Sequence, residues 1–337
     1  MILVTGGTGL LGSHLLYQLT QNDKEVRALY RNDAKKSKVL EIFGFYSSEP
    51  EKLFDQIHWV KADITDLGSL EPHFEHVEHV YHCAALISFD PKHLNDLLKI
   101  NVDGTANMIN LSIKHNIKKF CHVSSIAALG SGKKGQTEYD ENVEWNENQV
   151  SVYGISKFES ELEVWRGSQE GLSVVIVNPG IVLGPGFWRS GSGSLFKRAS
   201  KGSRYSFPGG TGFVSVNDVV NSMVLLMQSE IRNERYILVN QNLTYHDAFS
   251  RMAHGFEVEP PSKEVSLGLL EILWRIDFLK SVLFGKRRKL TKNIVKGLYQ
   301  QDMYNNSKSK TIPGFAYESL DEVISFCCEK LKAKMKV

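Results

Sequence analysis

The sequence predicts an α/β fold in which helices cover both faces of a parallel β-sheet. Short apolar runs alternate with helical patterns through the first 180 residues, and parallel neighbours need such crossover connections. A glycine-rich turn joins the first apolar run to the first helical pattern. We expect strands at residues 2–4, 26–29, 57–60, 79–82, 119–123 and 174–177.

The alternating pattern breaks after Pro179. Residues 180–212 contain nine glycines and two prolines, which favours a loop-rich excursion. Residues 213–216, 218–229 and 236–239 then predict a strand, a helix and a strand that resume the sheet, and the rest is mostly helical. We therefore predict two domains of interleaved segments: a sheet domain from 1–179 and 213–239, and a smaller, mostly helical domain from 180–212 and 240–337.

Composition excludes several classes of protein. The 337 residues are 42% hydrophobic and 23% charged, with a net charge of +2, which offers no global attraction for nucleic acid or an anionic membrane. The N-terminus shows no signal peptide, so we expect a cytoplasmic protein. The four cysteines have no metal-ligand spacing and are expected to be free thiols.

One apolar stretch, residues 265–284, needs separate consideration. Four charged residues interrupt it, so we do not expect a membrane span. A basic run, Lys286–Lys289, follows; we interpret it as a solvated helix end rather than a membrane contact, and its role stays open.

The turn after the first strand has the spacing of a dinucleotide-binding loop. Glycines 6, 9 and 12 would permit a tight turn, close approach of a pyrophosphate, and helix–strand packing, respectively. The phosphates would lie at the N-terminus of the following helix, where free N–H groups favour anions. This context predicts a Rossmann-type, doubly wound domain, and the smaller domain would bind the substrate.

The end of the second predicted strand indicates which dinucleotide is bound. An acidic residue there would bind the ribose hydroxyls of NAD, but this chain has Arg31, followed by Lys35 and Lys36. A guanidinium pairs bidentately with phosphate, so we predict NADP, with NAD as the second choice.

Tyr153 and Lys157 lie four residues apart on a predicted helix whose apolar face is formed by other residues. A cation close to a phenol would lower the phenol pKa from about 10 by about three units and poise it for proton transfer. Ser125 ends a predicted strand, the edge at which ligands of open α/β sheets gather.

Together these motifs resemble the extended short-chain dehydrogenase/reductase family over nearly the whole chain. The resemblance rests on Thr5–Gly12, Asp63-Ile64, His82–Ala85, Asn101–Thr105, Ser124-Ser125, Tyr153–Lys157 and Asn178–Gly180. It implies that Tyr153 is the acid/base, Lys157 holds the nicotinamide ribose and lowers the tyrosine pKa, Ser125 orients a carbonyl, and Asn101 supports the lysine through a water. The predicted cofactor-binding residues are Gly6, Thr8, Gly9, Leu10, Leu11, Gly12, Arg31, Lys35, Asp63, Ile64, Ala84, Ala85, Tyr153, Lys157 and Pro179.

Within the family, the chain is similar to dihydroflavonol-reductase-like enzymes at Val177–Pro185, at Asp140-Glu141 with Trp145, and at Ser307–Phe315. Dehydratases carry an Asp-Glu pair where this chain has Ile126-Ala127. The resemblance thus implies reduction of a ketone or aldehyde, with a small, hydrophobic carbonyl or hydroxyl compound as substrate. The substrate site is predicted to include Ser125, Phe187, Trp188, Arg189 and Phe207.

Two other functions stay open: a nucleotide-sugar epimerase with tightly bound NAD, and a non-catalytic NADP-binding sensor. The resemblance also implies a homodimer formed by the helix after Asn101 and the Tyr153 helix.

Four histidines recur every third residue: His73, His76, His79 and His82. Because this stretch crosses from a predicted helix to a predicted strand, we do not expect the four imidazoles to converge on a metal ion.

Overall fold

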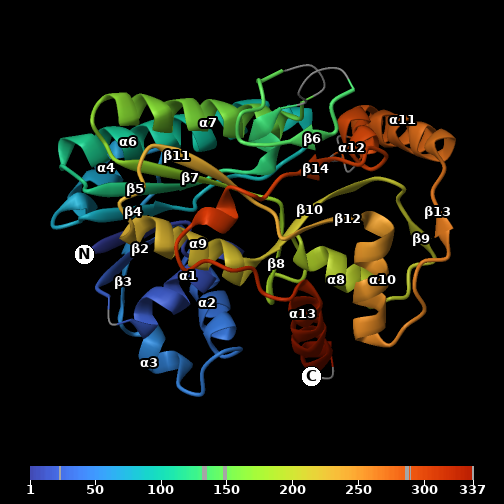
Figure 1. Ribbon diagram of the computed structural model, residues 1–337, viewed down its shortest axis with the longest axis horizontal. Helices are drawn as coiled ribbons and strands as arrows, with labels where there is room; N and C mark the ends of the chain where they lie inside the picture. Colours follow the sequence, from blue (N-terminus) through green and yellow to red (C-terminus); the bar gives the residue numbers. More distant parts are fainter. Residues whose placement is uncertain (23, 131–134, 147–149, 285–287, 289, 336–337) are drawn as a thin grey trace.

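The computed structural model describes all residues except 23, 131–134, 147–149, 285–287, 289 and 336–337. A seven-stranded sheet in the order β11-β7-β5-β4-β1-β2-β3 forms its centre, and all neighbouring strands are parallel (Figure 1). The strands are β1 (Ile2–Thr5), β2 (Val26–Tyr30), β3 (Ile57–Lys61), β4 (His79–His82), β5 (Lys119–Val123), β7 (Val174–Pro179) and β11 (Glu234–Leu238). The predicted α/β class and doubly wound parallel sheet are confirmed, and the strand order reverses between β1 and β4.

Two hydrophobic cores sandwich this sheet. Helices α1 (Leu10–Gln21), α2 (Lys36–Phe43) and α9 (Val216–Gln228) pack on one face, around Leu16, Phe43 and Met223. Helices α6 (Gly104–Lys114) and α7 (Val152–Gln169) cover the other face, around Ile109 and Val164. Because most residues of the inner strands β1, β2, β4, β5 and β7 are buried, these strands are rich in apolar residues, which is why the sequence pattern located them.

Helix α7 buries a polar face. Tyr153, Lys157 and Glu161 are buried, whereas Leu162 of the apolar face is 50% exposed. The buried polar groups are paired with one another and with the sheet, as described below.

A second group of elements adjoins the sheet. Strands β8 (Ile181–Leu183), β10 (Gly210–Ser215) and β12 (Gln241–Thr244) form a three-stranded sheet in the order β12-β10-β8. Helices α8 (Gly193–Ala199), α10 (Tyr245–Phe256) and α13 (Leu320–Met335) share its core with Phe196, Phe249 and Cys327.

Strand β10 differs from the sequence prediction, which put residues 213–216 in the large sheet. At Gly180 a Cβ atom would lie 2.3 Å from the carbonyl oxygen of Gly212, so the two chains approach too closely for any side chain. Strand β10 therefore pairs with β8 in the smaller sheet, and β11 pairs with β7 at the edge of the large sheet. The other boundaries of the two proposed domains stay a prediction.

The remaining elements are short or peripheral. They are α3 (Pro50–Phe54), α4 (Leu67–Leu70), α5 (Leu94–Leu97), α11 (Leu267–Phe284), α12 (Lys292–Gly297), and the paired two-residue strands β6 (Glu138–Tyr139) with β14 (Met303–Tyr304) and β9 (Tyr205–Ser206) with β13 (Lys263–Glu264). Among the helices that the structure describes, none combines the length and apolar character needed to cross a bilayer.

Candidate active site

The glycine loop between β1 and α1 is held by contacts that exclude side chains. Gly6 has a φ of 68°, and a Cβ atom there would lie 2.6 Å from the backbone at Cys83 and Ala84, just after β4. A Cβ atom at Gly12 would lie 2.2 Å from the carbonyl oxygen of Gly6. The Gly9 N–H donates to that same oxygen at 2.9 Å. The loop therefore lies directly against both the sheet and its own helix.

A groove of about 670 Å³ runs along this loop at the carboxyl ends of the strands. No side chain caps the first turn of α1, so its N–H groups are available to an anion. Of the predicted cofactor residues, the groove is lined by Gly6, Thr8, Gly9, Leu10, Arg31, Lys35, Ile64, Ala84 and Ala85. The side-chain-free loop and the open helix end fit a dinucleotide.

The other predicted cofactor residues do not line the groove: Leu11, Gly12, Asp63, Tyr153, Lys157 and Pro179. Asp63 instead faces Arg31, with Oδ2 3.6 Å from the guanidinium, and its Oδ1 accepts hydrogen bonds from Thr65. Burial opposes ionisation of Asp63, but the Thr65 hydrogen bonds and Arg31 outweigh it and lower the pKa of this carboxyl.

Phe187 and Arg189, which the sequence assigned to the substrate, line this same groove. Arg189 adds a third cationic side chain to Arg31 and Lys35. Its position depends on the loop after β8, which the sequence pattern did not place.

Tyr153 lies in the first turn of α7, whose N-terminus is capped by the Ser151 hydroxyl accepting from Gly154 N. The Tyr153 phenol is buried and hydrogen-bonds Ser125. The Ser125 hydroxyl accepts from Ala127 N at 3.1 Å, which leaves its proton to be donated toward the phenol oxygen. Ser125 and Tyr153, predicted from separate motifs, are brought together.

Lys157 is 1% exposed, and its ammonium faces the end of β5. Nζ donates to the Val123 carbonyl at 2.9 Å and lies 3.2 Å from Nε2 of His122. Burial lowers the pKa of Lys157 to about 8, against the raising effects of Glu161 and Cys83.

The structure differs from the expectation that Lys157 lowers the pKa of Tyr153. Burial raises the pKa of Tyr153 to about 12, and the Ser125 hydrogen bond offsets only part of that rise. A nearby cation lowers the pKa of a phenol, whereas the loss of solvent around a buried phenol raises it, and only the first effect could be expected from the sequence. Tyr153 is accordingly neutral at physiological pH.

Asn101 lies in a π-helical turn, Leu98–Asp103, and its support of Lys157 through a water stays a prediction. Its Oδ1 accepts from Leu86 N at 2.7 Å, and its Nδ2 donates to the Leu86 carbonyl and to Oγ of Ser156. Asn101 thus ties α7 to the loop after β4.

Sequence reasoning missed a buried network behind Ser125 and Lys157. Asn178 Nδ2 donates to the Ser125 carbonyl at 3.0 Å and to Glu161 Oε1 at 2.6 Å, and Glu161 Oε2 lies 3.4 Å from the Arg235 guanidinium. Glu161 is four residues beyond Lys157, so helical spacing would have placed it on the same face.

His82 links the glycine-loop strand to the Asn101 turn. The Thr105 hydroxyl donates to the Asn101 carbonyl, so it accepts from His82 Nε2, and His82 Nδ1 then accepts from the Thr5 hydroxyl. Burial lowers the pKa of His82 to about 3, so the ring is neutral and structural. Within the described residues no group of three His, Cys, Asp or Glu side chains could hold a metal ion.

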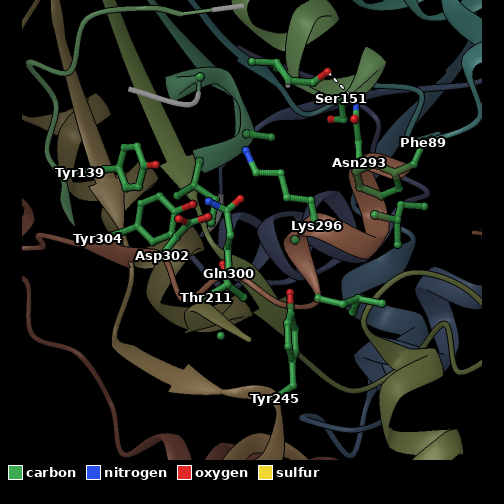
Figure 2. A pocket seen from close by; sticks show the side chains of 18 residues that line it. Phe89, Tyr139, Ser151, Thr211, Tyr245, Asn293, Lys296, Gln300, Asp302 and Tyr304 are labelled. Atoms are coloured by element: carbon green, nitrogen blue, oxygen red, sulfur yellow. Dashed lines mark hydrogen bonds between the residues drawn. The ribbon is translucent and has the colours of Figure 1, made fainter. Parts of the chain in front are cut away.

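A second pocket of about 370 Å³ adjoins Ser125 and Tyr153 (Figure 2). Its apolar end includes Phe89, whose ring packs edge-on against Tyr153 with centroids 5.6 Å apart. At its polar end, Figure 2 shows Asp302 beside the stacked rings of Tyr139 and Tyr304, and the Tyr245 hydroxyl points into the pocket. The remaining wall is formed largely by residues 293–300.

None of the predicted substrate residues lines this pocket. Trp188 is buried in the core against Phe196, and Phe207 packs behind Tyr245. Residues 139, 245 and 293–304 form the pocket instead. Tyr139 and Tyr304 are brought together by the short β6–β14 pairing, for which the sequence carries no signal.

Known proteins similar to this chain support the same interpretation of the fold. The model of the NAD dependent epimerase/dehydratase family matches residues 2–239. A putative dihydroflavonol 4-reductase of Synechocystis sp. is 28% identical over 335 residues, 96% of this chain and 92% of that protein. Sterol demethylase protein B of Methylococcus capsulatus is 30% identical over 247 residues, 72% of this chain and 70% of that protein. The crystal structure of gox2253 superposes with a TM-score of 0.80 at 23% identity, covering 99% of this chain and 98% of the other.

The fold, the glycine loop and the Ser125–Tyr153–Lys157 arrangement define an NAD(P)-dependent enzyme of the extended short-chain dehydrogenase/reductase type. The chain belongs to the NAD dependent epimerase/dehydratase family. Reductases related to dihydroflavonol 4-reductase are among its relatives.

Proposed function

We propose that the protein is an NADP-dependent reductase of a small, largely apolar ketone or aldehyde. The observation that carries this proposal is the Ser125–Tyr153 pair at the end of β5, next to a pocket whose near end is apolar. The similarity to dihydroflavonol-reductase-like relatives supports reduction over epimerisation.

When bound, the dinucleotide supplies the hydride. Tyr153 then donates the proton from its phenol to the carbonyl oxygen, and Ser125 donates a hydrogen bond to that oxygen or to the developing phenolate. Lys157, held at the Val123 carbonyl, is proposed to bind the nicotinamide ribose and to stabilise the tyrosinate left after proton transfer. Asn178 and Glu161 position Ser125 and Lys157.

NADP is proposed over NAD because three cationic side chains, Arg31, Lys35 and Arg189, line the groove near the end of β2. Arg31 contacts Asp63 at 3.6 Å, yet its side chain is 57% exposed and accessible to a 2′-phosphate. A guanidinium binds phosphate bidentately and would favour NADPH by this contact.

We also propose a cytoplasmic homodimer in which α6 and α7 meet their counterparts. These helices lie side by side on one outer face in Figure 1, and Leu162 of α7 is half exposed there. Sedimentation velocity of the wild type and of Leu162→Arg tests this assembly, because a dimer through α7 would dissociate in the variant.

The test of the proposed reaction is NADPH consumption in the presence of a panel of aryl and alkyl aldehydes and ketones, with UDP-glucose assayed in parallel. Net oxidation of NADPH by some carbonyl compounds is the expected result. Interconversion of the UDP-sugar without net cofactor consumption would contradict the reductase and support the epimerase. Cofactor binding with no turnover in either assay would support a sensor.

A further inference from the structure

Helix α11 lies at the outer end of the molecule (Figure 1), and most of its large apolar side chains are exposed. Only Leu270 and Ser281 of its eighteen residues are buried. Ten large apolar side chains are each at least 40% exposed: Leu267, Leu269, Ile272, Leu273, Ile276, Phe278, Leu279, Val282, Leu283 and Phe284. Contiguous apolar surface of this kind marks an interaction site.

The orientation of α11 is the reverse of that of a solvated amphipathic helix. At 3.6 residues per turn, Ile272, Ile276, Leu279 and Leu283 form one stripe on the side opposite Leu270 and Ser281. The inward side is held by polar contacts: Lys92 Nζ donates to Ser281 Oγ at 3.0 Å, and Asp277 Oδ2 accepts from Leu290 N at 3.1 Å. The protein thus directs the aliphatic stripe outward.

Exposed basic residues lie on this helix and next to it in the sequence. Among the described residues of the segment 263–300, six are basic and three are acidic. Lys296 lines the second pocket and the Arg288 side chain is only 12% exposed, which leaves Lys263, Arg275, Lys280 and Lys292 exposed. Two of the acids face arginines, since Glu271 lies 2.5 Å from Arg275 and Asp277 lies 4.0 Å from Arg288. The sequence adds three basic residues at 286, 287 and 289, which lie outside the described structure.

We propose that α11 lies in the surface of an anionic lipid bilayer, with its aliphatic stripe at the boundary between headgroups and acyl chains and its basic residues at lipid phosphates. An apolar face bordered by basic residues is the pattern of an interfacial helix. Charges at 271, 275, 277 and 280 exclude a span. The excess of positive charge favours binding to anionic lipid over binding to an uncharged protein surface.

Helix α12 packs against α11, and its residues Asn293 and Ile294 line the second pocket. The proposed membrane contact is therefore close to this pocket. The membrane contact itself does not depend on the proposed reaction.

Co-sedimentation with vesicles tests the proposal. We expect the full chain to bind phosphatidylcholine vesicles that contain about 30% phosphatidylserine, and to bind pure phosphatidylcholine vesicles more weakly. The triple variant Ile272→Ser/Leu279→Ser/Leu283→Ser should reduce the apparent partition coefficient by about tenfold or more, since three aliphatic side chains no longer enter the lipid. The control Leu67→Ser/Met335→Ser removes exposed apolar side chains elsewhere and should bind like the wild type. Circular dichroism and NADPH affinity report that each variant is folded.

The charge contribution is tested separately with Lys280→Gln/Lys292→Gln. This variant should lose affinity for the anionic vesicles while its weak affinity for neutral vesicles stays the same, and added salt should act in the same direction. Three results would overturn the proposal: a wild type that stays in the supernatant with both vesicles, a triple variant that binds as tightly as the wild type, or an oligomer that the triple variant dissociates without any vesicle binding. The last result would assign α11 to self-association.

Discussion

The buried carboxylate of Glu161 should set the pH range in which the enzyme works. Lys157 has a pKa lowered by burial to about 8, and Glu161 raises that pKa. If the Lys157 ammonium is required, kcat/KM should follow its protonated fraction, which is about 90% at pH 7 and about 10% at pH 9 for this pKa. We therefore expect kcat/KM to fall about tenfold between these pH values.

Glu161→Gln removes the charge and keeps the shape. It should move the alkaline limb to lower pH, because the uncharged side chain no longer raises the pKa of Lys157. Glu163→Gln is the matched control, since Glu163 lies on the same helix but pairs with Arg166 at 2.9 Å.

The assay is the pH profile of kcat/KM for NADPH-dependent reduction, which reports groups of the free enzyme. An alkaline limb at the same pH in the wild type and in Glu161→Gln would refute this reasoning. A wild-type profile that is flat up to about pH 10 would refute it as well.

Three further predictions concern the cofactor groove and the buried histidines. Gly12→Ala places a Cβ atom 2.2 Å from the Gly6 carbonyl oxygen, so it should lower the free energy of unfolding by about 1–3 kcal/mol and weaken NADPH binding. Gly268→Ala, whose Cβ atom has no neighbour within 4 Å, should do neither, and a Gly12→Ala variant as stable as the wild type in urea denaturation would contradict this prediction. Arg31→Ala should weaken NADPH binding, measured by fluorescence titration, by about tenfold or more and should weaken NADH binding less. An equal loss of affinity for both dinucleotides would contradict the proposed preference for NADP. Burial lowers the pKa of His14 to about 4 and of His82 to about 3 from 6.5, so the contribution of these neutral rings to folding stability is present above pH 6.5 and is lost as the pH falls. Between pH 7 and pH 5 each histidine should lower the free energy of unfolding, measured by urea denaturation, by about 2 kcal/mol. A free energy of unfolding that stays the same over this range would contradict the prediction.

The sheet could be predicted from the sequence because its inner strands are almost wholly buried and are therefore rich in apolar residues. Only the place of β10 was wrong, because its pairing depends on the close approach of Gly180 and Gly212, two positions distant in the sequence. Helical periodicity likewise located α7. It could not show that this helix buries polar groups, since their burial depends on partners such as Asn178 and Val123.

The proximity of Ser125 and Tyr153 could be predicted from sequence motifs, whereas the residues that line the second pocket could not. Ser125 and Tyr153 meet because the carboxyl end of β5 and the start of α7 face the same edge of the sheet. Trp188 and Phe207 are aromatic residues in the expected region, but both pack in or against the core of the smaller sheet. The pKa of Tyr153 could not be anticipated either, because desolvation depends on the packing of the whole site.

The central claim is that Tyr153 donates the proton in a hydride-transfer reduction. The most direct test is NADPH oxidation by the wild type and by Tyr153→Phe with a carbonyl compound that the wild type reduces, together with NADPH affinity measured by fluorescence. We predict that kcat falls by about 10²–10⁴-fold in the variant while NADPH affinity is retained. Full activity of Tyr153→Phe would contradict the account.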